Sequence, residues 1–267
     1  MPILLSDFIE TPQGKAGCVE LIKKMHYFKP VAQDTVESEY YSKKYPDLDE
    51  RGLQLLTHKQ FILEFFLDKN IGRWAINRKN LFLSPQLAAQ IAIPLKAALF
   101  DITNIGNCGG RASYAAFKLH EILEGSGLKV TVKSAKFADH VVVYIGKLPD
   151  LRVYDPLTNP ELIFGFEEYQ KKIMPLFKPR QVLEKLQIEV KITPALRNQY
   201  PTIKNEFCDL FVEEMHDPEK LQAFKEGIVG KVPNFHLFTL DILCDEFKKG
   251  FKKMQQKQAP VAEAKGP

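Results

Sequence analysis

The chain has 267 residues, of which 45% are apolar and 26% charged, a composition typical of an ordinary globular protein. Its net charge of +4 is concentrated at the end: the last twenty residues hold six lysines and one glutamate, so the rest sums to −1. This near-neutral body argues against nucleic-acid binding. No run is apolar and long enough for a membrane span, and the N-terminus lacks the features of a cleaved signal peptide.

Four cysteines are scattered along the chain, at Cys18, Cys108, Cys208 and Cys244. They form no CxxC pair and show no Cys/His spacing typical of zinc. A chain of this length does not need disulfides for stability, so we expect reduced thiols in a cytosol-like reducing compartment. No metal and no other cofactor is expected.

The first hundred residues are expected to be mainly helical and irregular. Apolar residues at helical spacing predict helices over 17–27 and 57–67. Ser84 followed by Pro85 is typical of a helix start, with serine as the cap and proline at the first helical position. Pro94 should end or kink the helix that follows.

After Cys108 the pattern is clearer. Apolar residues, many of them alanines, recur at helical spacing, so a helix is expected to begin at or just after Cys108. It should end at Gly125 or Gly127, since glycine suits a helix C-terminus. Alternating or β-branched runs then predict three strands, over 128–132, 140–145 and 151–155.

The remaining pattern predicts a helix over 166–174, a strand over 187–192, helices over 202–226 and 234–256, and a disordered polar tail over 257–267. The fold class is therefore α+β. A central antiparallel sheet packs on the helix that starts at Cys108, with helical N- and C-terminal parts. We expect a single domain over 1–256, with its core at about 84–192 and a helical C-terminal part over 200–256.

Cys108 is the first candidate for chemistry. A thiol at a helix N-terminus faces the orphan backbone N–H groups and the positive end of the helix dipole, and both favour the thiolate. Glycines at 106, 109 and 110 surround it, so we expect a substrate backbone to approach closely. The backbone N–H of Cys108 can then point at a developing oxyanion.

His140 and Asp155 form the second candidate group. If the loop between the two strands is Gly146–Pro149, Ile145 lies opposite Asp150 and His140 lies opposite Asp155. Directly opposed residues share a face with Cβ atoms roughly 4.5–5.5 Å apart. An Asp carboxylate there can accept from one imidazole nitrogen while the other faces the thiol. The neighbours on that face (Val142, Tyr144, Leu151 and Val153) are expected to pack on the Cys108 helix.

The other candidates have simpler explanations. His120 lies twelve residues along the helix from Cys108, about 18 Å away, so it is not the partner of the thiol. The Lys-rich segment FKKGFKKMQQK could contact an anionic membrane surface. We interpret it instead as a helix whose apolar stripe faces inward and whose lysines are solvated.

Three segments carry a family resemblance: GNCGGRASYAAFKLHEIL, ADHVVVYIG and VYDP. They resemble the Cys, His and Asp boxes of papain-like and transglutaminase-like cysteine enzymes, most closely the YopT/AvrPphB type of bacterial effector peptidase. The resemblance covers about fifty residues of the chain. It implies Cys108 as nucleophile, His140 as general base and acid, and Asp155 as the residue that orients His140.

The resemblance leaves the oxyanion partner open. Papain-like enzymes place a glutamine shortly before the cysteine, and none stands just upstream of Cys108. Asn104 is the closest amide side chain before the Gly-Asn-Cys turn and is our candidate. Gln86 and Gln90 are further candidates if their helix folds back.

The expected function is a thiol hydrolase, of protease or isopeptidase type, acting on a protein substrate through a Cys108–His140–Asp155 triad. By the resemblance, the substrate belongs to a host cell, and the protein reaches the host cytoplasm without a cleaved signal peptide. Two alternatives stay open. One keeps the triad but transfers the acyl group to an amine or deamidates glutamine. The other is a binding module without enzymatic activity.

Overall fold

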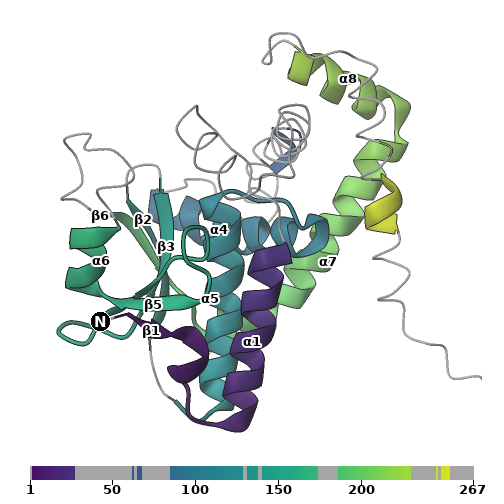
Figure 1. Cartoon of the computed structure of the whole chain (residues 1–267). Coiled ribbons are helices and arrows are strands. Elements are labelled where there is room, and N and C mark those ends of the chain that lie inside the picture. The colour runs from purple at the N-terminus through teal and green to yellow at the C-terminus, as the bar shows by residue number, and fades with distance from the viewer. Residues whose placement is uncertain are drawn as a thin grey trace, which may run out of the picture. The chain divides into compact units, whose positions relative to one another are not determined.

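The computed structural model describes residues 2–27, 62, 65–67, 85–128, 131–137, 140–173, 186–229, 245 and 248–252 (Figure 1). These group into two compact units, 1–201 and 202–267. The single domain expected over 1–256 stays a prediction. Most of the helices expected over 57–67 and 234–256, and the whole tail over 257–267, lie outside the described residues.

The first unit is built on a six-stranded sheet in the order β1-β5-β4-β3-β2-β6, in which every neighbouring pair is antiparallel. The described strands are β1 (Ile3–Leu4), β2 (Val132–Phe137), β3 (His140–Ile145), β4 (Arg152–Tyr154), β5 (Leu162–Gly165) and β6 (Leu186–Lys191). Helices and an antiparallel sheet occur together in one chain, so the α+β class is confirmed.

Helices cover both faces of this sheet (Figure 1). One face packs on α1 (Pro12–Tyr27), α4 (Pro85–Thr103) and α5 (Cys108–Gly125), which supply one apolar core together with the strands. The other face packs on the short helix α6 (Phe166–Lys172) in a separate cluster. The described part is completed by a 3-10 turn at Leu5–Asp7, by α7 (Pro194–His216) and by α8 (Pro218–Val229).

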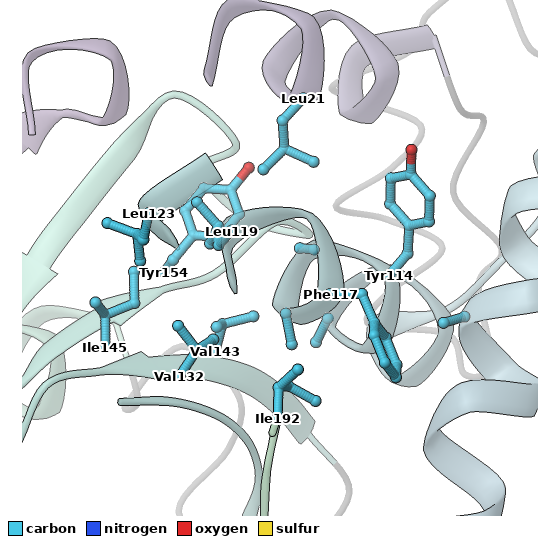
Figure 2. Packing of buried hydrophobic residues seen from close by; sticks show 14 of the residues in the cluster. Leu21, Tyr114, Phe117, Leu119, Leu123, Val132, Val143, Ile145, Tyr154 and Ile192 are labelled. Atoms are coloured by element: carbon cyan, nitrogen blue, oxygen red, sulfur yellow. The ribbon is translucent and has the colours of Figure 1, made fainter. Parts of the chain in front are cut away.

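Helix α5 lies at the centre of the larger core. Figure 2 shows Leu119 and Leu123 of α5 among Val143 and Ile145 of β3, with Leu21 of α1 in the same cluster. Each such aliphatic side chain contributes roughly 1.5–3 kcal/mol when fully buried. Three alanines of α5 (Ala112, Ala115 and Ala116) are completely buried. Their small side chains let α4 and the sheet pack closely against α5, which fixes the helix start relative to the strand ends.

Both ends of α5 lie where the sequence predicts them. Asn107 caps the start, because its side-chain oxygen accepts from the backbone N–H of Gly110 at 3.2 Å. At the other end Gly127 has a φ of +75°, its N–H donates to Glu124 O, and Leu128 N–H donates to Leu123 O. This is the Schellman pattern of helix termination. Because Leu128 takes part in ending the helix, it does not belong to a strand. The strand expected over 128–132 is therefore wrong, and β2 begins only at Val132.

Helix α4 does not end at Pro94 but continues to Thr103. The proline removes one backbone hydrogen bond. Beyond it, however, Leu95, Ala97 and Phe100 are buried in the core of the first unit. That packing outweighs the local cost, which explains why the helix persists.

The register of β3 and β4 differs from the predicted one by two residues. Ile145 pairs with Arg152, not with Asp150, and the ladder continues to Val143 opposite Tyr154. His140 and Asp155 are therefore diagonal neighbours instead of directly opposed residues. A shift of two keeps both on the same face, because side chains alternate with a period of two.

The face of that hairpin is also corrected. Val142, Tyr144 and Val153 pack with Tyr169 of α6, not on α5. The side chains that pack with α5 are their alternates, among them Val143 and Tyr154. The sheet is buried on both faces at this point, so an apolar pattern alone does not distinguish them.

The second unit contains most of α7 and all of α8. The single helix expected over 202–226 is wrong, because Asp217 and Pro218 divide it. Pro218 opens α8, and Asp217 Oδ1 accepts from the backbone N–H of Glu219 and Lys220 at 3.0 Å each. Phe251, in the described part of the Lys-rich segment, is buried and stacks on Phe211 with ring centroids 4.1 Å apart.

Candidate active site

Cys108 is the first residue of α5, as its sequence context predicts. Regular i→i−4 hydrogen bonding begins with Arg111 N–H donating to Asn107 O at 3.1 Å. The backbone N–H groups of Cys108 and Gly109 precede it in the first turn, where helical N–H groups have no partner inside the helix. The Lys96 ammonium of α4 lies 3.7 Å from the place a Gly109 Cβ would occupy. The thiol thus lies at the N-terminal end of α5, where the helix dipole favours negative charge.

His140 and Asp155 make direct contact. His140 opens β3 and Asp155 follows β4, so both lie at the same end of this antiparallel pair. His140 Nε2 lies 2.9 Å from Asp155 Oδ2. Asp155 is 0% exposed and His140 7%. The contact expected from the alternation of the strands is confirmed, as a diagonal pair.

Cys108 meets the other side of the imidazole. Its side chain interacts with His140 by a hydrogen bond and by charge. Since Nε2 is used by Asp155, Nδ1 is the ring nitrogen left available to the thiol. Cys108 also packs against Leu157 and Val141, which flank the site. The three residues singled out in the sequence are therefore adjacent in space, in the order thiol, imidazole, carboxylate.

The carboxylate of Asp155 is held by four donors. The turn that follows β4 folds back so that the backbone N–H groups of Leu157 and Thr158 donate to Oδ1, at 3.1 and 3.3 Å. Oδ2 accepts from His140 and also from the hydroxyl of Tyr169, at 2.7 Å. A carboxylate offers about four lone-pair sites. All four are used, which is how this group is accommodated in a fully buried position.

The two buried groups stabilise one another as an ion pair. Burial alone lowers the pKa of His140, but the charge and hydrogen bond of Asp155 and the contact with Cys108 outweigh it and raise that pKa. Burial raises the pKa of Asp155, but His140, Tyr169 and Thr158 outweigh it and lower that pKa. Asp155 is thus held ionised and His140 is held protonated near neutral pH.

The glycines around Cys108 have a packing explanation. A Cβ on Gly106 would lie 2.6 Å from Cδ2 of Phe100, and one on Gly110 would lie 3.6 Å from the Phe100 Cβ. The second distance is an ordinary van der Waals contact, so it is at Gly106 that the absence of a side chain lets the turn before α5 lie directly on α4. Close approach of a substrate, the reason first expected, is not needed to explain Gly106.

Asn104 takes part in ending α4. Its backbone is in the left-handed region with φ of 60°, and its N–H donates to Phe100 O at 3.0 Å. Asparagine is one of the few residues other than glycine that adopts this conformation readily at a helix end. Its side chain is exposed. This accounts for asparagine at the position, and its role as oxyanion donor stays a prediction.

Two residues of the site were missed in the sequence. Tyr169 lies in a helix with an ordinary apolar stripe, and only its buried hydroxyl, which needs a partner, could have indicated a polar role. Arg111 is 1% exposed; its Nε donates to Gly106 O at 3.1 Å and its guanidinium reaches Met25 O of α1 at 3.4 Å. A cation within the alanine stripe of α5 was the available signal. Arg111 ties the turn before Cys108 to a second helix.

The other described histidines and cysteines lie in different settings. His26 pairs with Glu161 at the surface, and His216 contacts Val212 O near the end of α7. Cys18 and Cys208 are buried and carry no disulfide. Within the described residues, no group of three or more His, Cys, Asp or Glu side chains could hold a metal ion.

Comparison with protein-family models, with curated proteins and with solved structures gives no match to this chain. None of the helices in the described part of the chain is long and apolar enough to cross a membrane.

Proposed function

We propose that this protein is a cysteine hydrolase that cleaves an amide or isopeptide bond in a protein substrate. Cys108 is the nucleophile, His140 the general base and acid, and Asp155 the residue that orients His140. The observation that carries the proposal is the continuous chain of interactions from the Cys108 thiol through His140 to the buried Asp155 carboxylate. Its order and its helix-start setting agree with a papain-like catalytic core, to which the three sequence boxes bear a resemblance.

Acylation is the first half of the reaction. His140 holds the proton of Cys108, and the thiolate attacks the carbonyl carbon, so that a C–S bond forms and the carbonyl electrons move to oxygen. As the C–N bond breaks, His140 gives its proton to the leaving amine. The product of this half is a thioester between the acyl group and Cys108.

Hydrolysis of the thioester completes the cycle. His140 takes a proton from water while the hydroxide attacks the carbonyl carbon, the C–S bond breaks, and the proton returns to the Cys108 sulfur. The oxyanion formed in each half of the reaction lies near the helix start and needs hydrogen-bond donors that point at it. The first-turn N–H groups of Cys108 and Gly109 are suited to this role, with Asn104 as the side-chain candidate.

The decisive experiment measures the reaction of each thiol with iodoacetamide at pH 7 by peptide mass spectrometry. We expect Cys108 to react much faster than Cys18 and Cys208. Burial raises the pKa of Cys18 to about 11, which makes it a slow internal reference. Exposure differs as well, since Cys108 is 7% exposed and the two others 0%, so this comparison needs a further control.

His140→Gln supplies that control, because it leaves Cys108 in place but removes the base. We expect this variant to react at Cys108 about 10²-fold more slowly, a typical loss when a general base is removed. His216→Gln, at the end of α7, should leave the rate unchanged. If wild type and His140→Gln alkylate Cys108 at the same rate, the activated-nucleophile proposal fails.

The bond acted on is read from products. Lysate treated with the wild-type protein should show new protein N-termini that Cys108→Ala does not produce. Deamidated glutamine or added amine in place of new N-termini would indicate acyl transfer or deamidation through the same acyl-enzyme. Phenotypes fully retained by Cys108→Ala would indicate a binding module.

A further inference from the structure

Tyr169 reaches the triad from the opposite side of the sheet to α5. It lies on α6, is completely buried, and packs edge-on against Phe164 with ring centroids 5.9 Å apart. Its hydroxyl donates to Asp155 Oδ2 at 2.7 Å, a distance shorter than the 2.9 Å between that oxygen and His140 Nε2. Tyrosine and histidine therefore share one carboxylate oxygen.

That sharing has an electrostatic consequence. A hydrogen bond to a carboxylate draws negative charge toward its donor, so less remains to attract a second donor on the same oxygen. The two donors on Oδ1 are backbone N–H groups of the turn after β4, which the chain fixes. Tyr169 and His140 are thus the two side chains that donate to Oδ2.

We propose that Tyr169 is a positioning residue of the site: by sharing Oδ2 of Asp155, its hydroxyl limits how tightly that carboxylate holds the proton on His140. The inference rests on the proposed function for its catalytic meaning. An imidazolium held too tightly is a weaker acid toward the leaving amine. A tyrosine at this point keeps His140 ionised and oriented and still able to give up its proton.

Other titratable groups face the cluster of Tyr169, Asp155 and His140 from the elements packed around it. In the described part of the chain they are Cys108 of α5, Tyr144 of β3 and Tyr154 of β4. Tyr144 lies in the same apolar cluster as Tyr169 but does not hydrogen-bond to Asp155. It therefore provides a matched control.

The test follows the imidazole of His140 by NMR between pH 6 and 12, because the pKa of His140 is raised to about 10, with its signal assigned by loss in His140→Gln. Tyr169→Phe keeps the ring and removes the hydroxyl. We expect the titration of His140 to move to higher pH by roughly half a unit or more, and Tyr144→Phe to leave it in place. An unchanged midpoint in Tyr169→Phe, or a downward shift, overturns the proposal.

A second variant keeps the hydroxyl and guards against misfolding of Tyr169→Phe. 3-Fluorotyrosine at position 169 is a more acidic donor and gives a stronger hydrogen bond to Asp155. Burial and the charge of Asp155 raise the pKa of Tyr169, so the fluorinated side chain stays protonated in this range. The His140 titration should then move to lower pH, and a shift in the opposite direction contradicts the proposal.

This readout does not depend on catalysis. If Cys108 proves unreactive but His140 titrates as expected in both variants, the proposed function fails while the effect of Tyr169 on His140 holds. If Cys108 is reactive but the midpoints do not move, the hydrolase proposal stands and the role of Tyr169 fails.

Discussion

Replacing Asp155 with asparagine should disable His140 while keeping the shape of the side chain, because one carboxylate oxygen becomes an NH₂ group. The backbone N–H groups of Leu157 and Thr158 both donate to one oxygen of residue 155. An asparagine must therefore place its carbonyl oxygen on that side, since its NH₂ group cannot accept. The NH₂ then faces His140 Nε2, which has to become an acceptor, and the ring proton moves to Nδ1, toward Cys108. In this tautomer His140 cannot take the thiol proton.

The same substitution removes the ion pair between Asp155 and His140. The resulting loss of stability can be worked out from the pKa shift of Asp155. The pKa of Asp155 is lowered from 3.8 to about 2 against the opposing effect of burial, chiefly by the charge and hydrogen bond of His140. At 1.36 kcal/mol per unit, that difference corresponds to about 2 kcal/mol of stability. We expect Asp155→Asn to lower the free energy of unfolding by about 2 kcal/mol at pH 5–6, and to lower the Cys108 alkylation rate at pH 7 by about 10²-fold.

The pH dependence distinguishes this explanation from a general packing defect. Asp155 has a lowered pKa, so its contribution is present above 3.8 and is lost as the pH falls toward 2. His140 has a raised pKa, so its contribution is complete below 6.5 and is lost as the pH rises toward about 10. The stability difference between wild type and Asp155→Asn should therefore be largest between these limits and decline on both sides.

Urea unfolding followed by circular dichroism, at pH values from 3 to 9, measures this difference. Asp150→Asn, at an exposed position of the same hairpin, is the matched control and should show no such maximum. A stability difference that stays constant over the whole pH range would refute the ion-pair reasoning, whatever its size.

The remaining predictions concern the start of α5. Gly106→Ala should cost about 1–3 kcal/mol in urea unfolding, because its Cβ would lie 2.6 Å from the Phe100 ring; Gly125→Ala, with no atom within 4 Å, should change stability far less and serves as its control. Asn107→Ala should lower the free energy of unfolding by about 1 kcal/mol because it removes the helix cap. Asn107→Asp keeps a capping oxygen and should retain most of the stability. Equal losses in each pair would contradict the packing and capping explanations.

The sequence predicts the ends of α5 and the pairing of His140 with Asp155 for physical reasons that are local. The apolar spacing that begins after Cys108 marks the start, and a glycine suited to a left-handed cap marks the end. The strict alternation of strand side chains fixes which residues share a face. A register error of two residues leaves that face unchanged, so the contact is found at 2.9 Å although the loop of the hairpin is longer than expected.

The choice of face could not be predicted. Val142, Val143, Tyr144 and Ile145 are all buried, and consecutive buried residues give no signal for one side of the sheet over the other. Whether α5 or α6 covers a given side depends on chain connections that span many residues. Tyr169 was missed for the same reason, because its partner lies fourteen positions earlier and on a different element.

The two-sided burial explains how the site is assembled. Cys108 comes from the α5 side of the sheet and Tyr169 from the α6 side, and the ends of β3 and β4 carry His140 and Asp155 between them. A sheet with one solvated face would leave the carboxylate exposed to water, which weakens the ion pair by raising the local dielectric. Because both faces are covered, Asp155 is shielded from water, and its four hydrogen-bond donors stabilise the carboxylate in that buried position. Changes on α6 should consequently alter the chemistry of Cys108, even though the two helices lie on opposite faces of the sheet.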